Sequence, residues 1–429
     1  MEKLNEDFII NLSNNKGEPL WMKNFRLNSY KKFLELDNPS FGPKINIDFD
    51  NLVYHKGLFA PPSCSWENVD KKVKNTFNDL GVIEAENKYL KGVSNRYESE
   101  VIYHKMEESD GIIFLSTDEA LKKYPELFEK YFNNLVKYDE NKYTALNGAL
   151  WSGGSFIYIP PYTKVDRPLQ SYFRIDTKNL GQFERTIIIV DHDSSLHYIE
   201  GCTAKNYSTT SLHAGVVEIY VGKNSTCKYS TIQNWSKDVY NLVTKRAILE
   251  EGAYMQWVDG NIGSGVTMKY PSCILKGDNS KASSISIAYA KEGQHLDAGA
   301  KMIHLGKNTK STIISKSIAG FGGTSDYRGT VKIAKDATGS FATIKCDNII
   351  LDNISSSNTY PKNIVENNES TLEHEATISK INEEKLNYLM SLGISEDAAK
   401  DLYVLGFMSD FKKSLPMEYA VELNRLIKE

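Results

Sequence analysis

The chain has 429 residues, of which 41% are hydrophobic and 25% are charged, and its formal net charge is −4. This composition is that of a globular protein with two or three folded units, and the slightly acidic balance argues against a nucleic-acid-binding surface. The sequence has no signal-peptide pattern and no apolar stretch near the roughly 20 residues that cross a bilayer, and its cysteines are too far apart for a disulfide scaffold. We therefore expect a cytoplasmic protein that binds neither nucleic acid nor membrane.

Residues 1–148 are predicted to form a mostly helical N-terminal region. Apolar residues recur at helical spacing over 21–33, and the same spacing is found over 66–79 and 117–147. Ser116 would cap the helix that follows it, because serine side chains accept hydrogen bonds from the first free backbone N–H groups of a helix.

Residues 149–380 have the pattern of short strands. Runs of alternating polar and apolar residues include Ser155–Ile159, Val216–Val221 and Gly329–Ile333. Turn-forming clusters recur at intervals of 27 to 31 residues, and they begin at Asp191, Gly222, Glu250, Gly277, Gly306 and Lys335. A repeat of this length in strand-rich sequence indicates a solenoid, in which each unit buries its apolar face by stacking on the next. The expected fold class is therefore mainly β, with a right-handed parallel β-helix core flanked by helical N- and C-terminal regions.

An antiparallel sandwich is the alternative fold for this region. Its strands would be joined by hairpins, and Asp259-Gly260 is the only clear hairpin-turn signal among the predicted strands. The regular spacing of the turns favours the solenoid.

Residues 381–429 are predicted to form a small helical module. A first helix has an apolar face around Leu386, and Gly393 ends it. Ser395 begins a second helix and Pro416 a third. The module would close the open end of the solenoid, or present a docking surface for a partner, or do both.

Cys346 and the run Glu373-His374-Glu375 have the clearest potential for metal chemistry. Thiolate, imidazole and carboxylate groups all ligate iron, and thiolate is the usual ligand of iron–sulfur clusters. Because the chain has no Cys-x-x-Cys pair, such a site would hold a cluster loosely, as expected of a protein that builds clusters and passes them on. In an extended strand, Glu373 and Glu375 lie on one face and His374 on the other, so an ideal strand cannot direct all three at one ion.

Several longer motifs occur in order along the chain. They are GQFERT from 181, YIEGCTA from 198, KYSTIQNW from 228, VTKR from 243, KYPSCIL from 269, TKSTIISK from 309, YRG from 327 and LEHEAT from 372. In these motifs the chain resembles the SufB family of the SUF iron–sulfur cluster assembly system, over about residues 85–429. The resemblance implies a parallel β-helix with helical flanks, in agreement with the periodicity.

The resemblance also implies the residues of a cluster site. Cys346 would accept persulfide sulfur and ligate the cluster. His374 and Glu375 would be further iron or cluster ligands, and Glu373 is a third candidate.

A sulfur path is implied as well. Sulfur would arrive at Cys202 and pass to Cys346 through the interior of the β-helix, a transfer that needs a thiolate at each end and a polar path between them. The candidate residues of this path are Arg174, Gln233, Trp235 and Lys245. At Asp176 the chain departs from the family, which often has asparagine there, and a carboxylate would oppose anionic sulfur. Cys227 and Cys273 are interpreted as buried structural residues.

The implied cofactor is a transient iron–sulfur cluster, either [2Fe–2S] or [4Fe–4S], and the binding of reduced flavin is left open. The implied partners are a SufC-type ABC ATPase on the C-terminal helices, a SufD-type paralogue or a second SufB copy, a cysteine desulfurase with its sulfur-shuttle protein, and apo-proteins that accept clusters. The chain has no P-loop motif, so ATP hydrolysis would come from the partner. We therefore expect a scaffold protein and not an enzyme.

Two other functions are alternatives. A SufD-like structural subunit would belong to the same complex but carry no cluster of its own, and the presence of Cys346 with Glu373-His374-Glu375 favours SufB. A carbohydrate-active solenoid enzyme would need paired carboxylates in an exposed groove and usually a secreted context.

Overall fold

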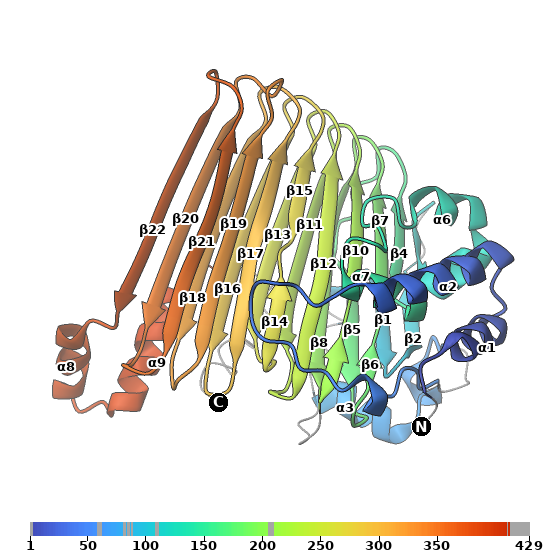
Figure 1. Cartoon of the computed structure of the whole chain (residues 1–429), viewed down its shortest axis with the longest axis horizontal. Helices are drawn as coiled ribbons and strands as arrows, with labels where there is room; N and C mark the ends of the chain where they lie inside the picture. Colours follow the sequence, from blue (N-terminus) through green and yellow to red (C-terminus); the bar gives the residue numbers. More distant parts are fainter. Residues whose placement is uncertain are drawn as a thin grey trace.

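Two facing sheets of stacked strands form a β-solenoid of about eight turns, as predicted (Figure 1). The computed structural model describes residues 3–57, 62–79, 83, 86, 89–107, 111–204, 210–409 and 411. The helix predicted from Pro416 lies outside the described residues.

The 10-stranded sheet forms one wall of the solenoid. Its spatial order is β2 (Glu100–Met106), β1 (Gly92–Tyr97), β5 (Leu169–Ile175), β8 (Ser195–Ala204), β11 (Thr226–Asn234), β13 (Tyr254–Ile262), β16 (Lys281–Ala290), β18 (Lys310–Ala319), β20 (Phe341–Ile350) and β22 (Thr371–Lys380).

The 12-stranded sheet forms the facing wall. Its order is β21 (Ser356–Val365), β19 (Thr324–Ile333), β17 (His295–His304), the pair β14 (Val266–Lys269) and β15 (Ser272–Leu275), β12 (Val239–Leu249), β10 (Val216–Val221), β7 (Arg185–Val190), β4 (Ser155–Ile159) and β3 (Ile113–Ser116). Two short strands, β6 (Gly181–Gln182) and β9 (Ser211–His213), pair with each other, and β9 also pairs with β12. Strand neighbours are parallel except in the pairs β1–β2 and β3–β4, so the antiparallel sandwich is excluded.

The predicted turn clusters lie where the chain passes between the walls. In three of them an asparagine has the left-handed backbone conformation that the turn requires, with φ of 56° at Asn224, 59° at Asn279 and 55° at Asn308. Asparagine adopts this conformation more readily than most residues. The spacing of the turns also sets the strand register, which places Ser315 directly opposite Cys346.

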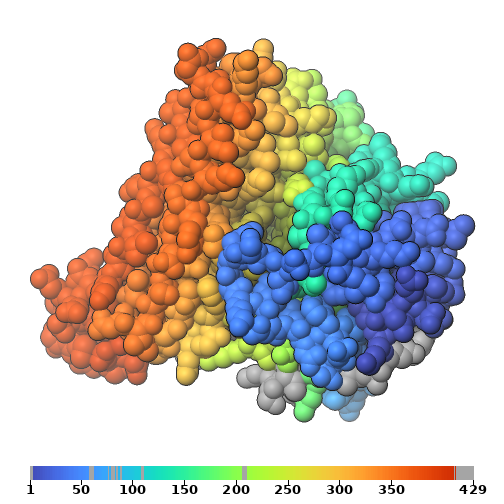
Figure 2. Space-filling view, in the orientation of Figure 1, coloured from blue at the N-terminus to red at the C-terminus, as the bar shows by residue number. Residues whose placement is uncertain are grey.

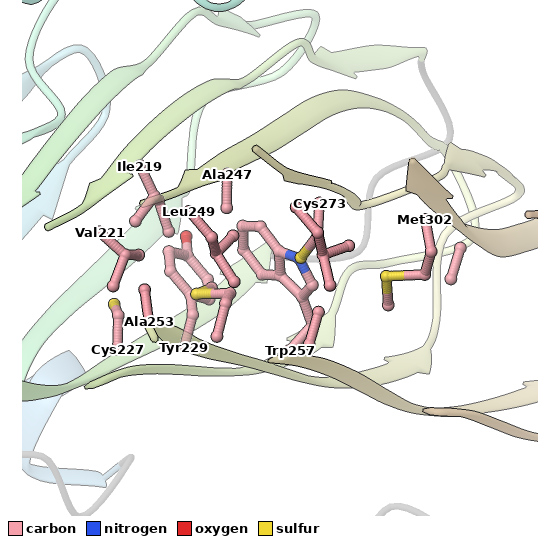
Figure 3. Packing of buried hydrophobic residues seen from close by; sticks show 14 of the residues in the cluster. Ile219, Val221, Cys227, Tyr229, Ala247, Leu249, Ala253, Trp257, Cys273 and Met302 are labelled. Carbon is pink, nitrogen blue, oxygen red and sulfur yellow. The ribbon is translucent and has the colours of Figure 1, made fainter. Parts of the chain in front are cut away.

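Apolar side chains from both walls fill most of the interior and provide the main driving force for folding. Figure 3 shows Tyr229 and Trp257 of the 10-stranded sheet among Leu249 and Cys273 of the facing sheet. The Trp257 indole Nε1 donates a hydrogen bond to the Cys273 sulfur at 3.2 Å.

The N-terminal region packs against one side of the solenoid and is drawn in blue to teal in Figure 2. Its helices are α1 (Glu6–Lys16), α2 (Leu20–Glu35), α3 (Lys71–Asp79), α5 (Thr117–Lys123), α6 (Pro125–Tyr131) and α7 (Lys142–Leu150), with short 3₁₀ turns η1 (Phe49–Asn51) and η2 (Trp66–Asn68).

The prediction of a mostly helical N-terminal region missed β1, β2 and β3, which extend the two sheets. All six residues of β1 are buried, and they include Ser94, Asn95 and Arg96. A strand buried on both faces shows no alternation of polar and apolar residues, so the period-two signal is absent from its sequence.

Within the part of the chain that the structure describes, two helices follow β22, with the boundaries that the sequence indicates. They are α8 (Glu383–Ser391) and α9 (Glu396–Phe407), the latter capped by the Ser395 side chain. Val404, Met408 and Phe411 pack with isoleucines on the outer face of the 10-stranded sheet. The helices therefore lie beside this sheet and leave β21 and β22 with exposed side chains, including those of Ile378 and Val365. No helix in the described part of the chain is long and apolar enough to cross a membrane.

Candidate functional site

One line of inward positions on the 10-stranded sheet is polar on every strand from β8 to β20. Every second residue of a strand points to the same face, and parallel pairing aligns these residues from strand to strand. We call this line the inner polar row; its members, each opposite the next in the strand register, are Glu200, Thr231, Asp259, Ser286, Ser315 and Cys346. All six are buried. The row leads from the strand that carries Cys202 to Cys346 without an apolar interruption.

Cys202 lies two residues beyond Glu200, the first member of this row, on the same inward face, and is 1% exposed. Its thiol donates to Glu200 Oε1 across 3.8 Å, and the Lys245 ammonium lies 3.5 Å from the same oxygen. Burial raises the pKa of the Cys202 thiol well above its usual value, and the neighbouring Glu200 acts in the same direction. Burial also raises the pKa of Glu200, although Lys245 opposes this shift. In the resting protein Cys202 is therefore a protonated thiol.

A buried network of hydrogen bonds and ion pairs continues from Cys202 along the interior. Gln233 is the neighbour of Cys202 in the strand register, and its Oε1 accepts from Asn241 at 2.7 Å and from Lys269 at 3.2 Å. The Lys269 ammonium also donates to Asp259 Oδ1 at 2.8 Å. The network thus joins the neighbours of Cys202 to the third member of the inner polar row.

The two lysines of this network differ in the direction of their pKa shifts. Burial would lower the pKa of Lys245, but Glu200 and Asp259 more than offset this effect and the pKa is raised. At Lys269 burial outweighs Asp259, and the pKa is lowered. Lys245 is therefore a firmly charged cation beside Cys202.

Three of the four predicted path residues lie around Cys202. Gln233 and Lys245 make the contacts given above. Trp235 packs in the same apolar cluster as Cys202, and its ring lies 4.8 Å from that of His213. His213 is in turn 3.2 Å from the buried Glu184 carboxylate.

Arg174 lies on the other face of the sheet. Phe173 is opposite Cys202 in the register, so Arg174 shares its side with Thr203, to which it donates at 3.0 Å. Its guanidinium also pairs with Asp176 at 2.6 Å. The structure therefore separates Arg174 from the interior path, and the carboxylate at Asp176 neutralises it locally.

Cys346 ends the inner polar row and is buried, next to the Tyr327 side chain of the facing sheet. Burial raises the pKa of the Cys346 thiol to about 12, although the Tyr327 hydroxyl acts in the opposite direction. Reaction at Cys346 as a thiolate therefore requires a charge-stabilising ligand, such as a metal ion, or a rearrangement that admits water.

The run Glu373-His374-Glu375 divides between the two faces of β22, as the strand geometry predicts. His374 lies opposite Ile344, on the inward side with Cys346, and its Nδ1 is 3.1 Å from the Asn363 amide. One strand spacing and two residues separate Cys346 from His374, which places their Cα atoms about 8 Å apart.

Glu373 and Glu375 point outward, and Glu375 pairs loosely with Lys345 at 3.8 Å. Within the described residues, no group of three or more His, Cys, Asp or Glu side chains is assembled for a metal ion. Cys346 and His374 thus share a face, and the two glutamates are not directed at them.

From the sequence, no role was assigned to Glu200, Lys269, Ser286 or Ser315. Asp259 was interpreted only as part of a hairpin-turn signal, although it lies within β13. Their signal was present as polar residues in phase with the buried positions of the strands, such as Ser284 with Ser286 and Ser315 with Ser317. These residues can be recognised as one continuous row only when the register between strands about 29 residues apart is known.

Comparison with known proteins places the chain in a family. Residues 173–407 match the family described as "SUF system FeS cluster assembly, SufBD core domain", and residues 69–171 match "SufBD protein N-terminal region". The chain is 52% identical over 429 residues to the iron–sulfur cluster assembly protein SufB of Bacillus subtilis, covering 99% of this chain and 92% of that protein. It is 54% identical, with the same coverage, to iron–sulfur cluster assembly SufBD family proteins of Staphylococcus saprophyticus and Staphylococcus aureus. The chain belongs to the SufB family of iron–sulfur cluster assembly proteins of the SUF system.

Proposed function

We propose that this protein is a scaffold on which iron–sulfur clusters are assembled from persulfide-derived sulfur and iron, and from which they pass to apo-proteins. The observation that carries the proposal is the inner polar row, a line of buried polar residues in a largely apolar interior. At one end of the row Glu200 lies beside Cys202, and the other end is Cys346. A structural subunit would gain more stability from apolar residues at these buried positions.

Sulfur is delivered to Cys202 in this account. The Lys245 ammonium beside Glu200 stabilises negative charge that develops on the sulfur when Cys202 reacts. Gln233 and Trp235 shape the space next to Cys202. A cysteine desulfurase and its shuttle protein supply the sulfur, and no step of this chemistry requires nucleotide binding by the chain itself.

The cluster is built at Cys346, with His374 as the second ligand on the same inward face. Glu375 and Glu373 face outward, so they reach iron only if β22 rearranges or if a partner surface brings iron to them. Loose ligation by few protein groups suits a cluster that must leave.

A second subunit covers the last strands of the solenoid. β21 and β22 end the two sheets, and their exposed side chains include Ile378, Val365 and Tyr360. An exposed sheet edge with apolar side chains is a natural pairing surface. A SufD-type paralogue or a second copy of this chain would fit it and would enclose the region around His374.

A SufC-type ATPase docks on α8 and α9. These helices form an apolar groove, and its lining includes the exposed Tyr388 and Leu402. The end of α9 is tied to β18, because the Lys316 ammonium donates to the Phe407 carbonyl at 2.8 Å. Since β18 is the neighbour of β20, movement of α9 during ATP hydrolysis would reach the strand of Cys346 and favour a state in which the buried thiol is accessible.

Leu402→Glu is expected to weaken ATPase binding at least about ten-fold, because it places a charge in the centre of an apolar contact. Glu384→Gln on the first turn of α8 is the matched control and should bind normally. Isothermal titration with the purified ATPase measures both. Full affinity of Leu402→Glu, or of a chain truncated after Ile381, would contradict docking at these helices.

Anaerobic incubation with ferrous iron and sulfide, followed by mixing with an apo-ferredoxin, tests the function. A scaffold acquires visible absorbance and acid-labile sulfide and then transfers both to the acceptor. A SufD-like subunit acquires neither under the same conditions. The two possibilities are thus separated by iron and sulfide content alone.

A further inference from the structure

Glu200 and Cys202 place a carboxylate and a thiol side by side in the interior. They are two residues apart on β8, so both side chains point to the inward face of the strand. Both are buried, and the Cys202 thiol donates to Glu200 Oε1 across 3.8 Å. A buried carboxylate costs stability unless it is paired, and a carboxylate with a shifted pKa beside a nucleophile is a mark of a functional site.

Two neighbours hold the Glu200 carboxylate in place. The Tyr229 hydroxyl donates to Oε2. The Lys245 ammonium lies 3.5 Å from Oε1 and 4.4 Å from the centre of the Tyr229 ring. Oε1 is therefore shared between a cation and the Cys202 thiol, while Oε2 is fixed by the phenol. A carboxylate held in this way is already oriented to accept the thiol proton.

A proton that passes from Cys202 to Glu200 leaves the net charge of this buried group of side chains unchanged. The negative charge moves from the carboxylate to the sulfur, and the Lys245 ammonium favours the charged form of both. Burial raises the pKa of the Cys202 thiol, and the charge on Glu200 raises it further. The second effect disappears once Glu200 holds the proton, so the transfer itself makes the thiolate easier to form.

Other titratable groups also act on Glu200 from the surrounding strands. Burial raises the pKa of Glu200 most, and Glu184 adds to this shift, whereas Lys245 and His213 oppose it. The full set of these groups is Tyr198 on the same strand, Glu184 just before β7, His213 on β9, Tyr229 on β11, Lys245 on β12 and Lys269 on β14. Glu200 is the group that accepts a hydrogen bond from the Cys202 thiol, so it can receive the thiol proton directly.

Two other buried cysteines, shown in Figure 3, have different surroundings. Cys227 lies between the apolar Leu196 and Met255 in the strand register. Cys273 accepts a hydrogen bond from the Trp257 indole. Neither is paired with a carboxylate within the described part of the chain, so the carboxylate distinguishes the thiol on β8 from both.

We propose that Glu200 is the general base that takes the proton of Cys202 when this cysteine accepts sulfur from a persulfide, and that Tyr229 positions the carboxylate for this step. The inference rests on the proposed function and adds a catalytic residue to the acceptance of sulfur at Cys202. Lys245 then stabilises the charge on the sulfur while Glu200 is protonated.

The step needs no oxidant or reductant. The Cys202 sulfur attacks the terminal sulfur of the donor persulfide, which keeps its own proton, while the Cys202 proton passes to Glu200. The bond between the two donor sulfurs breaks, and the inner sulfur leaves with the electron pair as a thiolate. This thiolate takes the proton from Glu200, so the products are a persulfide on Cys202 and the donor thiol.

The test mixes the full chain with a sulfur-shuttle protein that was loaded with persulfide beforehand, in a single turnover. Rapid quenching, alkylation and mass spectrometry measure the persulfide on Cys202. Glu200→Gln keeps the shape of the side chain and removes the base, and it should accept sulfur at least about 100-fold more slowly than the wild type at neutral pH. The matched control is Glu218→Gln, which removes a buried, ion-paired carboxylate elsewhere and should accept sulfur at the wild-type rate.

The pH dependence separates the loss of a base from a disturbed structure. The rate of the wild type should level off once Glu200 is ionised. The rate of Glu200→Gln should keep rising by about ten-fold per pH unit until the thiol itself ionises. The ratio of the two rates cancels any effect of pH on the donor, so the deficit should shrink as the pH rises. Equal rates for the two proteins, or a deficit that does not change between about pH 6 and 9, would overturn the inference.

Both glutamine variants should form a cluster normally from ferrous iron and added sulfide, which shows that they are folded. If Glu200→Gln does not fold, Tyr229→Phe tests the same step, because it keeps the ring beside Lys245 and removes the hydroxyl that holds Glu200. It should accept sulfur at least about ten-fold more slowly. A wild-type rate for Tyr229→Phe would then overturn the inference. Absence of persulfide on Cys202 in the wild type would overturn sulfur delivery to Cys202 in the proposed function, and the inference with it.

Discussion

Cys346→Ser is expected to lose most of its cluster in anaerobic reconstitution with ferrous iron and sulfide. The substitution preserves the shape of a fully buried side chain but replaces a soft thiolate by a hydroxyl, which is a poor ligand for iron–sulfur clusters. We expect the content of acid-labile sulfide to fall at least about ten-fold. Mutation of residues that merely support metal ligands already lowers metal affinity by about this factor, and Cys346 is proposed as a ligand itself.

Cys227→Ala is the matched control for this loss. Cys227 is equally buried, but its neighbours in the strand register are the apolar Leu196 and Met255, so its replacement should leave the content of iron and sulfide unchanged. A Cys346→Ser protein that binds iron and sulfide as well as the wild type would show that Cys346 is not a ligand.

Asp259→Ala is expected to lower the free energy of unfolding by about 3–5 kcal/mol, because it leaves the buried Lys269 without its carboxylate partner. Removal of both charges, in Asp259→Asn combined with Lys269→Met, should recover much of this loss. Urea unfolding followed by circular dichroism measures both variants. The control is Glu250→Ala, which breaks a surface pair with Lys276 and should cost at most about 1 kcal/mol.

The stability that Asp259→Ala loses should depend on pH, and it should become smaller as the pH rises. Burial lowers the pKa of Lys269 below its ordinary value of 10.5, so the unfolded chain binds a proton more readily than the folded one. Stability should therefore rise as the pH increases from the lowered pKa of folded Lys269 towards 10.5. If the free energy of unfolding of Asp259→Ala fell further below that of the wild type as the pH increased in this range, the loss of stability could not be due to a buried Lys269 ammonium group.

The repeat was the part of the fold that the sequence revealed most fully. Turn clusters from Asp191 to Lys335 recur at nearly constant spacing because each turn of a solenoid has the same circumference. β10 was predicted with its observed boundaries. β1 was missed because strands buried on both faces do not alternate, and its Arg96 reads as a surface residue in isolation.

The candidate site was predictable only in part. Cys202, Gln233 and Lys245 were identified through family motifs, and the structure brings them together. Ser286 and Ser315 were not identified from the sequence, because serines are common on strands. Their alignment depends on a strand register that spans many turns of the solenoid. Arg174 lies on the opposite face of the sheet from Cys202, because Phe173 and not Arg174 is opposite Cys202 in the strand register.

In the proposed function, sulfur arrives at Cys202 and is used for cluster assembly at Cys346. The most direct measurement compares the initial rate of cluster formation in the wild type and in Cys202→Ser, first with cysteine and its desulfurase and then with added sulfide. We expect Cys202→Ser to form no cluster with the desulfurase and to match the wild type with added sulfide. Equal rates for the two proteins with the desulfurase would contradict this expectation, because sulfur would then reach Cys346 without passing through Cys202.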